Sequence, residues 1–225
     1  VDHVSFESGN RLLELPADRS RPAVRTGQGA LEAFKLAPEV RDALKACAKQ
    51  HAVTPFAVCL AMYATLLHKY SRQASVCVGV PVAGRQQPET HALIGFFVNT
   101  IVLQVSFDAE LSVRTLLSRA MAAAAQGLAH QDVPFEQVVS ALQPPRSTSC
   151  TPLFQAGLAF QNVPRTALRA ADLAVERVDL DPRVSKFDLH LTILEHEGEY
   201  EGTLEYSTDL FDASTAERML RHFST

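Results

Sequence analysis

Several features that mark common classes of protein are absent from this 225-residue sequence. No apolar run approaches the roughly 18 residues of a membrane-spanning helix, and the first residues are polar, without the apolar core of a signal peptide. The net charge is −4 and the pI is near 6.1, which argues against a nucleic-acid-binding protein. The sequence has no internal repeat, and because it lacks an initiator Met we expect it to be a piece of a longer protein.

Paired cysteines and metal-binding histidine patterns are also missing. The four cysteines are scattered without a Cys-x-x-Cys pair, which favours a reduced, cytoplasmic setting, and we expect Cys47, Cys59 and Cys77 to be small core residues. No Gly-x-Ser-x-Gly segment is present to supply a nucleophilic serine. Six histidines lack metal-ligand spacing to carboxylates or cysteines: His51, His68, His91, His190, His196 and His222. We therefore predict no metal site.

What the sequence does contain is the composition of an ordinary globular domain or of a large lobe of something bigger. Hydrophobic residues make up 47% and charged residues 20%. Residues 1–27 carry prolines at 16 and 22 and are predicted to be an extended N-terminal extension and linker. Residues 28–225 are predicted to form the folded unit.

Apolar spacing and turn residues predict the elements of that unit. Helices are expected from Pro38, from Pro55 with Thr54 as its cap, over 112–129 and 134–142, and after a capping box at Ser214-x-x-Glu217. Strands are expected at 28–36, 75–82, 97–106, 153–161, 173–180, 187–196 and 200–207, the last two as a hairpin. Helices between strands require crossovers and the hairpin requires antiparallel pairing, so the fold class is α/β, a mixed sheet with helices packed on it.

Two short runs carry the most information. Ile94-Gly95-Phe96-Phe97-Val98-Asn99-Thr100 places an amide in a stretch expected to be sheet core, and about 30 residues later comes His130-Gln131-Asp132-Val133-Pro134-Phe135-Glu136. In this order and at this separation the runs resemble two signature motifs of the condensation domains of nonribosomal peptide synthetases. The family's acid/base motif, His-His-x-x-x-Asp-Gly, occurs nowhere in the sequence.

The resemblance extends over nearly the whole chain. The segments 13–22, 186–189 and 202–211 resemble the entry into the family's C-terminal lobe and its closing strands. Residues 146–153, Arg-Ser-Thr-Ser-Cys-Thr-Pro-Leu, depart from the family's usual Arg-Asp-x-Ser-Arg-Asn-Pro-Leu, and Gln104 stands where an Arg is usual. These departures weaken the assignment of a particular subtype of condensation domain.

The resemblance implies a chloramphenicol acetyltransferase-like two-layer sandwich and only the C-terminal of two such lobes. The partners it implies are the N-terminal lobe, upstream and downstream peptidyl carrier proteins and an adjacent adenylation domain, with no nucleic acid and no membrane. The substrates would be aminoacyl and peptidyl thioesters carried on phosphopantetheine, joined by amide bond formation in antibiotic or other secondary metabolism. No cofactor is expected to bind directly. No catalytic residue is expected in this chain, which alone would be inactive.

Four residues are candidates for lining the substrate tunnel: Gly95, Phe97, Asn99 and Thr100. Asn99 either bonds backbone at a strand end or orients the acceptor amine or nascent oxyanion. Gly95 either lets backbone approach a pantetheine arm or supplies a turn. A second set is interpreted as structural: His130, Gln131, Asp132, Pro134, Phe135, Ser149, Pro152 and Asp188. Within that set, Asp132 is predicted to cap the helix that begins at Pro134.

Three rival interpretations remain open. One is an epimerisation domain, against which the run from His130 to Glu136 favours condensation. Another is a non-catalytic condensation-like domain that recruits a tailoring enzyme such as an oxygenase. The third is a free-standing binding module that is not part of an enzyme.

Overall fold

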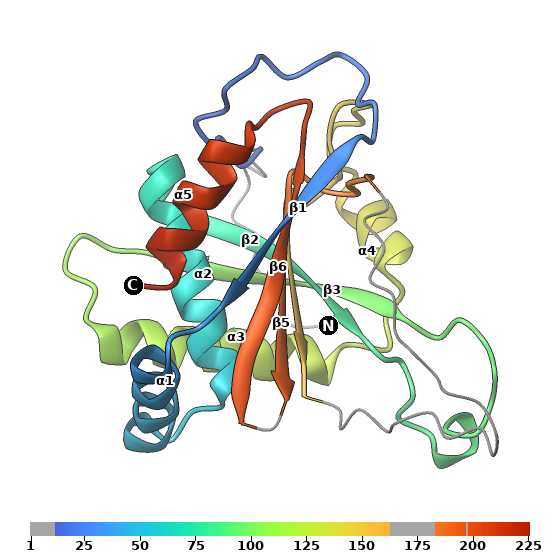
Figure 1. Cartoon of the computed structure of the whole chain (residues 1–225). Helices are drawn as coiled ribbons and strands as arrows, with labels where there is room; N and C mark the ends of the chain where they lie inside the picture. The colour runs from blue at the N-terminus through green and yellow to red at the C-terminus, as the bar shows by residue number, and fades with distance from the viewer. Residues whose placement is uncertain (1–11, 163–182, 197) are drawn as a thin grey trace, which may run out of the picture.

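A six-stranded mixed sheet forms the centre of the structure (Figure 1). The computed structural model describes residues 12–162, 183–196 and 198–225. The strands lie in the order β1-β6-β5-β4-β2-β3. Their bounds are β1 Gly29–Lys35, β2 Ser75–Val82, β3 Asn99–Ser106, β4 Ala156–Gln161, β5 Leu189–His196 and β6 Glu199–Ser207.

The sheet is parallel only in its middle. Strands β2 and β5 run parallel to β4, whereas the β2–β3, β5–β6 and β1–β6 pairs are antiparallel. The predicted hairpin is confirmed, with Leu189 opposite Tyr206 and His196 opposite Glu199. Strand β1 comes first in sequence but pairs with the last strand, from Gly29 opposite Ser207 to Lys35 opposite Glu201.

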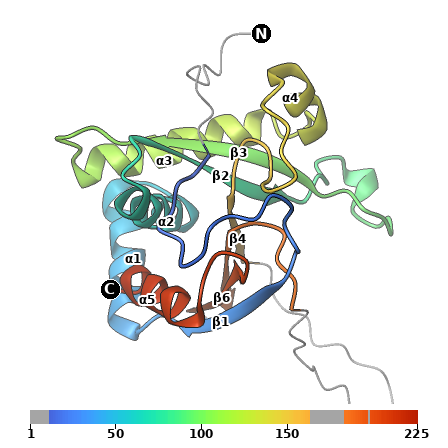
Figure 2. The same cartoon turned by 90° about the horizontal axis from the view of Figure 1, so that it is seen from above.

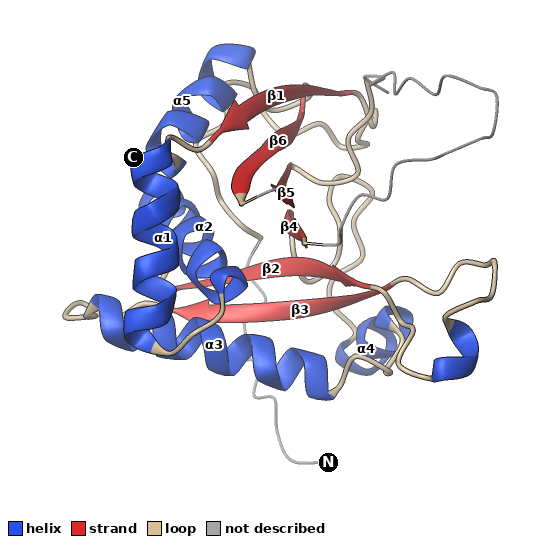
Figure 3. Ribbon diagram, turned by 60° about the horizontal axis from the view of Figure 1, so that its bottom comes forward, coloured by secondary structure: helices blue, strands red, loops and turns tan. Residues whose placement is uncertain are grey.

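Helices cover the sheet unevenly. Figures 1 and 3 show α1, α2 and α5 gathered on one side of it, while α4 lies apart at the opposite end. Seen from above, α3 runs alongside β3 (Figure 2). The bounds are α1 Pro38–His51, α2 Pro55–Ser71, a 3-10 turn η1 Pro88–Thr90, α3 Val113–Ala129, α4 Phe135–Leu142 and α5 Ala213–Phe223.

Helix α2 is the central core helix. It is apolar nearly all round, and eight of its residues are buried, among them Leu60, Tyr63 and Leu67. Thr54 caps it as predicted, its hydroxyl accepting a bond from the Ala57 amide at 3.1 Å. Among the described residues no single helix is long and apolar enough to cross a membrane; α1 and α2 satisfy that test only as a pair bent by 110°.

The α/β class and most element positions are confirmed, with two corrections. The strand expected from residue 97 begins at Asn99; before it, Val98 is exposed and Phe97 is half-buried. Helix α5 has its N-cap at Asp212 without a side-chain cap from its own turn, so the predicted capping box at Ser214 is wrong. The strand predicted at 173–180 lies outside the described residues.

Candidate functional site: a cavity beside α4 and an exposed apolar loop

The loop between β2 and β3 is a shaped projection. The Arg85 guanidinium donates to the carbonyl of Thr90, to that of Leu93 at 2.9 Å and to that of Gly95 at 3.3 Å. It also lies over the Phe97 ring, 4.3 Å from the ring centroid. One arginine therefore organises the whole loop.

The tip of this loop is apolar and exposed. Ile94 is fully exposed and Phe96 is 90% exposed, and Leu93 and Val98 are also in solvent. The expectation that residues 94–98 belong to the sheet core is wrong, because the chain leaves the sheet at Val82 and re-enters only at Asn99. We call Leu93, Ile94, Phe96 and Val98 the apolar tip. Such a cluster is typical of a surface that contacts another protein or lobe.

Asn99 links the start of β3 to the turn before α4. Its amide nitrogen donates to the carbonyls of Gln131 and Val133, both at 2.8 Å, and its oxygen accepts from the Phe135 amide at 3.1 Å. Every polar atom of this side chain is thus bonded to backbone. Of the two alternatives for Asn99, the geometry favours the backbone role over contact with substrate.

The same contacts correct the predicted cap. The N-cap position of α4 is Pro134, and Asn99, rather than Asp132, supplies an acceptor to the first turn. Asp132 is exposed, as is His130, which closes the end of α3 through backbone bonds. The side-chain Nε2 of Gln131 donates to the carbonyl of Leu128 at 2.9 Å. These positions make the segment a connection between two helices.

Phe135 and Phe154 dock α4 on the sheet. Their ring centroids are 5.7 Å apart in an edge-to-face arrangement, and Phe154 lies directly on Gly79 of β2. A Cβ at residue 79 would come within 2.2 Å of the Phe154 ring, so glycine is required for this approach. No residue of α4 itself is buried, so these rings and Asn99 hold the helix in place.

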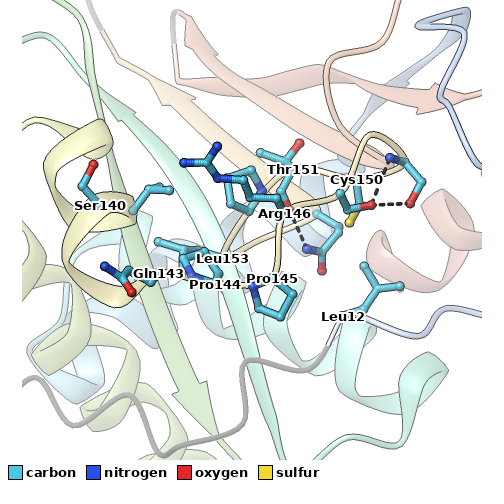
Figure 4. A pocket seen from close by; sticks show the side chains of 14 residues that line it. Leu12, Ser140, Gln143, Pro144, Pro145, Arg146, Cys150, Thr151 and Leu153 are labelled. Carbon is cyan, nitrogen blue, oxygen red and sulfur yellow. Dashed lines mark hydrogen bonds between the residues drawn. The ribbon is translucent and has the colours of Figure 1, made fainter.

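A cavity of about 1010 Å³ opens between α4 and the loop that follows it (Figure 4). Residues 144–150, here called the wall loop, form much of its lining, together with Val139 of α4, Gln143 directly after α4 and Leu12 from the N-terminal segment. Buried Leu153 also lines it and has a φ of 68°, in the left-handed region that a leucine seldom adopts. Pro152 and Ser149 also line it.

The lining of the cavity offers groups that can bind a polar ligand but no group suited to proton transfer. It offers the Arg146 guanidinium, the Cys150 thiol, several hydroxyls and amides, and three prolines. No histidine or carboxylate is among the lining residues, so neither a nucleophile–base pair nor a general acid can be assembled there from the described part of the chain. Across these described residues, no group of three or more potential metal ligands occurs.

The N-terminal segment is fastened to the body at many points. We call residues 12–26 the strap. The Asp18 carboxylate accepts from the Asp212 amide at 2.8 Å and from the Thr215 hydroxyl at 3.0 Å, which supplies the cap that α5 lacks. The bond from the Asp212 amide is the main reason that the pKa of Asp18 is lowered. The strap contains no helix, in line with the extended segment predicted from its prolines, and these bonds fasten it to α5.

The Arg21–Asp188 ion pair is the most buried attachment of the strap. The guanidinium bonds both carboxylate oxygens, one at 3.0 Å, and a third bond reaches the Ser149 carbonyl at 3.2 Å. The side chains are 22% and 7% exposed. Bonding to Asp188 raises the pKa of Arg21. The sequence predicts a structural role for Asp188, but it does not single out Arg21, Asp18 or Arg85. The only sequence signal for Arg21 and Asp18 is their charge within a proline-rich stretch.

Comparison with known proteins reveals the family. The model of the family described as "Condensation domain" matches residues 5–225. One of the subunits of linear gramicidin synthase from Brevibacillus parabrevis is 41% identical over 215 residues, 95% of this chain but only 3% of that protein. Malpinin synthetase from Mortierella alpina is 41% identical over 207 residues, 92% of this chain and 3% of that protein. The chain thus spans a small fraction of the curated relatives it matches.

Solved structures agree with the fold. A holo four-domain nonribosomal peptide synthetase bound to AMP and glycine superposes with a TM-score of 0.82 at 30% identity, over 93% of this chain and 17% of that one. The X-domain in complex with OxyB from teicoplanin biosynthesis gives 0.83 at 24% identity, over 97% of this chain and 50% of that one. The second likeness shows the fold alone, and together they confirm the predicted architecture.

Proposed function

Because the chain belongs to the condensation-domain family, we propose that it is the C-terminal lobe of such a domain in a nonribosomal peptide synthetase of the cytoplasm. In this proposal the complete domain joins two carrier-bound thioesters, and the lobe contributes binding surface rather than an acid or base. The partners are the N-terminal lobe, the upstream and downstream peptidyl carrier proteins and the adjacent adenylation domain.

One observation carries the lobe assignment. The apolar tip, with Ile94 and Phe96 in solvent, is held in a fixed shape by Arg85, and Leu128 and Val133 are also exposed. Exposed apolar side chains on a preformed loop are stabilised when a second surface covers them. A matching lobe would do so, and the chain's coverage of half of the X-domain chain supports a two-lobe arrangement.

In this reaction the lobe needs to supply binding surface rather than an acid, a base or a nucleophile. The acceptor amine attacks the donor thioester carbonyl, a C–N bond forms, the C–S bond breaks and the pantetheine thiol leaves with a proton. Holding two reactants in place can supply about 7–11 kcal/mol of the barrier at best. Part of that positioning falls to the cavity beside α4, whose Arg146 and amide groups suit a polar tethered substrate.

The experiment is a reconstituted assay with two loaded carrier proteins. The chain by itself should give no amide product above the uncatalysed rate, whereas the chain with its preceding lobe should give product. Product from the chain alone would overturn the lobe assignment. Racemised donor without product would instead support the epimerisation alternative.

A second candidate function follows from one likeness. The X-domain that superposes on this chain was solved in complex with OxyB. If the complete domain is a non-catalytic recruiting domain, it should bind a tailoring enzyme of its own pathway and form no amide bond. Measuring both properties on one preparation separates the two functions.

A further inference from the structure

The strap and the wall loop lie against each other at the rim of the cavity. We propose that the strap positions the wall loop, and that Arg21 and Thr148 are the positioning residues that keep the cavity shaped for a carrier-bound substrate. The part of this inference that concerns substrate rests on the proposed function. The part that concerns the wall loop rests on the contacts alone.

Three hydrogen bonds join the two segments. Arg21 donates to the Ser149 carbonyl at 3.2 Å, the Arg25 amide donates to the Thr148 carbonyl at 3.2 Å, and the Thr148 hydroxyl donates to the Ala23 carbonyl at 2.7 Å. Within the described part of the chain, these are the only hydrogen bonds that connect residues 144–150 to any other segment. The wall loop therefore depends on the strap for its place.

The rest of the surroundings offers the wall loop little support. Helix α4, which precedes it, buries none of its residues, and the loop begins with Pro144 and Pro145, which have no amide hydrogen to donate. Its two inner bonds join Ser149 to Ser147 within the loop itself. Apart from its covalent ends, the wall loop is therefore held in place mainly by its three hydrogen bonds to the strap.

Arg21 connects the wall loop to the sheet. Asp188, its partner, is fixed by its own backbone, which bonds the Gln155 carbonyl at 2.9 Å and the Ser207 amide at 3.0 Å. The guanidinium therefore makes two bonds to a rigid point at the start of β5 and one bond to the wall loop, at the Ser149 carbonyl. Loss of the bonds from Arg21 and Thr148 would therefore release the cavity wall, while Leu13 at the start of the strap stays packed in the core.

Trypsin provides a direct probe, because the exposed bond after Arg146 lies in the wall loop. The test variants are Thr148→Val, which removes one strap bond, and Arg21→Lys, which keeps the charge opposite Asp188 but loses the fork. The matched control is Thr65→Val in α2, which removes a hydroxyl bond to a carbonyl of the same 2.7 Å length away from the loop. Native cleavage after Arg146 is followed by mass spectrometry on the full protein containing this chain.

We expect cleavage after Arg146 to be about 3–10-fold faster in both test variants, the range of one lost hydrogen bond, and unchanged in the control. In the two-carrier assay, the KM for one carrier-bound substrate should rise by a similar factor while kcat stays within about 2-fold. Unchanged cleavage in Thr148→Val, or equal acceleration in the control, would overturn the role of the strap. Faster cleavage with an unchanged KM would overturn its role in substrate positioning. A protein that forms no amide bond would refute the proposed function, while the cleavage result would still decide whether the strap holds the wall loop.

Discussion

Replacing Asn99 by alanine is the sharpest test of how this site is built. The side chain makes three backbone bonds, two at 2.8 Å and one at 3.1 Å, and the last serves the first turn of α4. Each bond contributes about 0.5–1.5 kcal/mol, which sets an upper value of about 4.5 kcal/mol for the three. Val133 and Pro134 are exposed, so water can replace part of the loss, and we expect Asn99→Ala to lower the free energy of unfolding by about 2 kcal/mol.

Urea unfolding measures this directly, and two further variants sharpen it. Gln104→Ala on the same strand removes an amide with one side-chain bond, to the Ser75 hydroxyl at 2.7 Å, and should cost about 1 kcal/mol or less. Asn99→Asp places a carboxylate against two carbonyl oxygens, so it should be as destabilising as alanine at neutral pH and recover in acid. If Asn99→Ala left stability within about 0.5 kcal/mol of wild type and reduced amide formation about 10-fold or more, Asn99 would act on substrate and our reasoning would fail.

Further predictions concern single side chains. Arg21→Ala should lower the free energy of unfolding in urea by about 3–5 kcal/mol because it leaves the buried Asp188 carboxylate unpaired. Arg19→Ala removes a half-exposed pair with Asp212 and should cost about 0–1 kcal/mol. Equal losses in the two variants would contradict the argument from burial. Asp132→Ala should change stability by less than about 0.5 kcal/mol, and a loss of about 1 kcal/mol or more would restore it as a cap. Burial lowers the pKa of His190 below 6.5, so as the pH falls the unfolded chain binds the proton before the folded chain does, and stability should fall as the pH drops through 6.5. A His190→Gln variant should show a flatter dependence of melting temperature on pH. An unaltered slope in that variant would show that other groups set the pH dependence of stability.

Much of the fold could be predicted because its signals are local. Thr54-Pro55 and Ser112 are short-range caps, and each opens its helix as expected. The valine-rich run at 75–82 is a strand with neighbours on both edges, β4 and β3. In these cases the pattern and the final environment agree, because the nearest residues in sequence decide the outcome.

The candidate site could not be predicted in the same way because its contacts are long-range. Asp132 stands beside α4 in sequence, yet Asn99, 36 residues before Phe135, is the residue that bonds its first turn. Ser214 fits a local capping pattern, yet Asp18, 197 residues before Thr215, supplies the carboxylate. The apolar side chains of Ile94 and Phe96 were expected in the core because composition records hydrophobicity and not which surface a loop presents.

The pairing of the first strand with the last has a consequence for synthesis on the ribosome. Arg21 and Asp188 lie 167 residues apart in the chain, and the whole of β1 pairs within β6. At roughly 5–20 residues per second, the nascent strand waits about 10–30 s for its partner. During that time its backbone edge is unpaired and open to chaperones or to a neighbouring nascent chain. The rate at which ribosomes cross residues 36–207 is therefore expected to influence how much of this protein reaches the folded state.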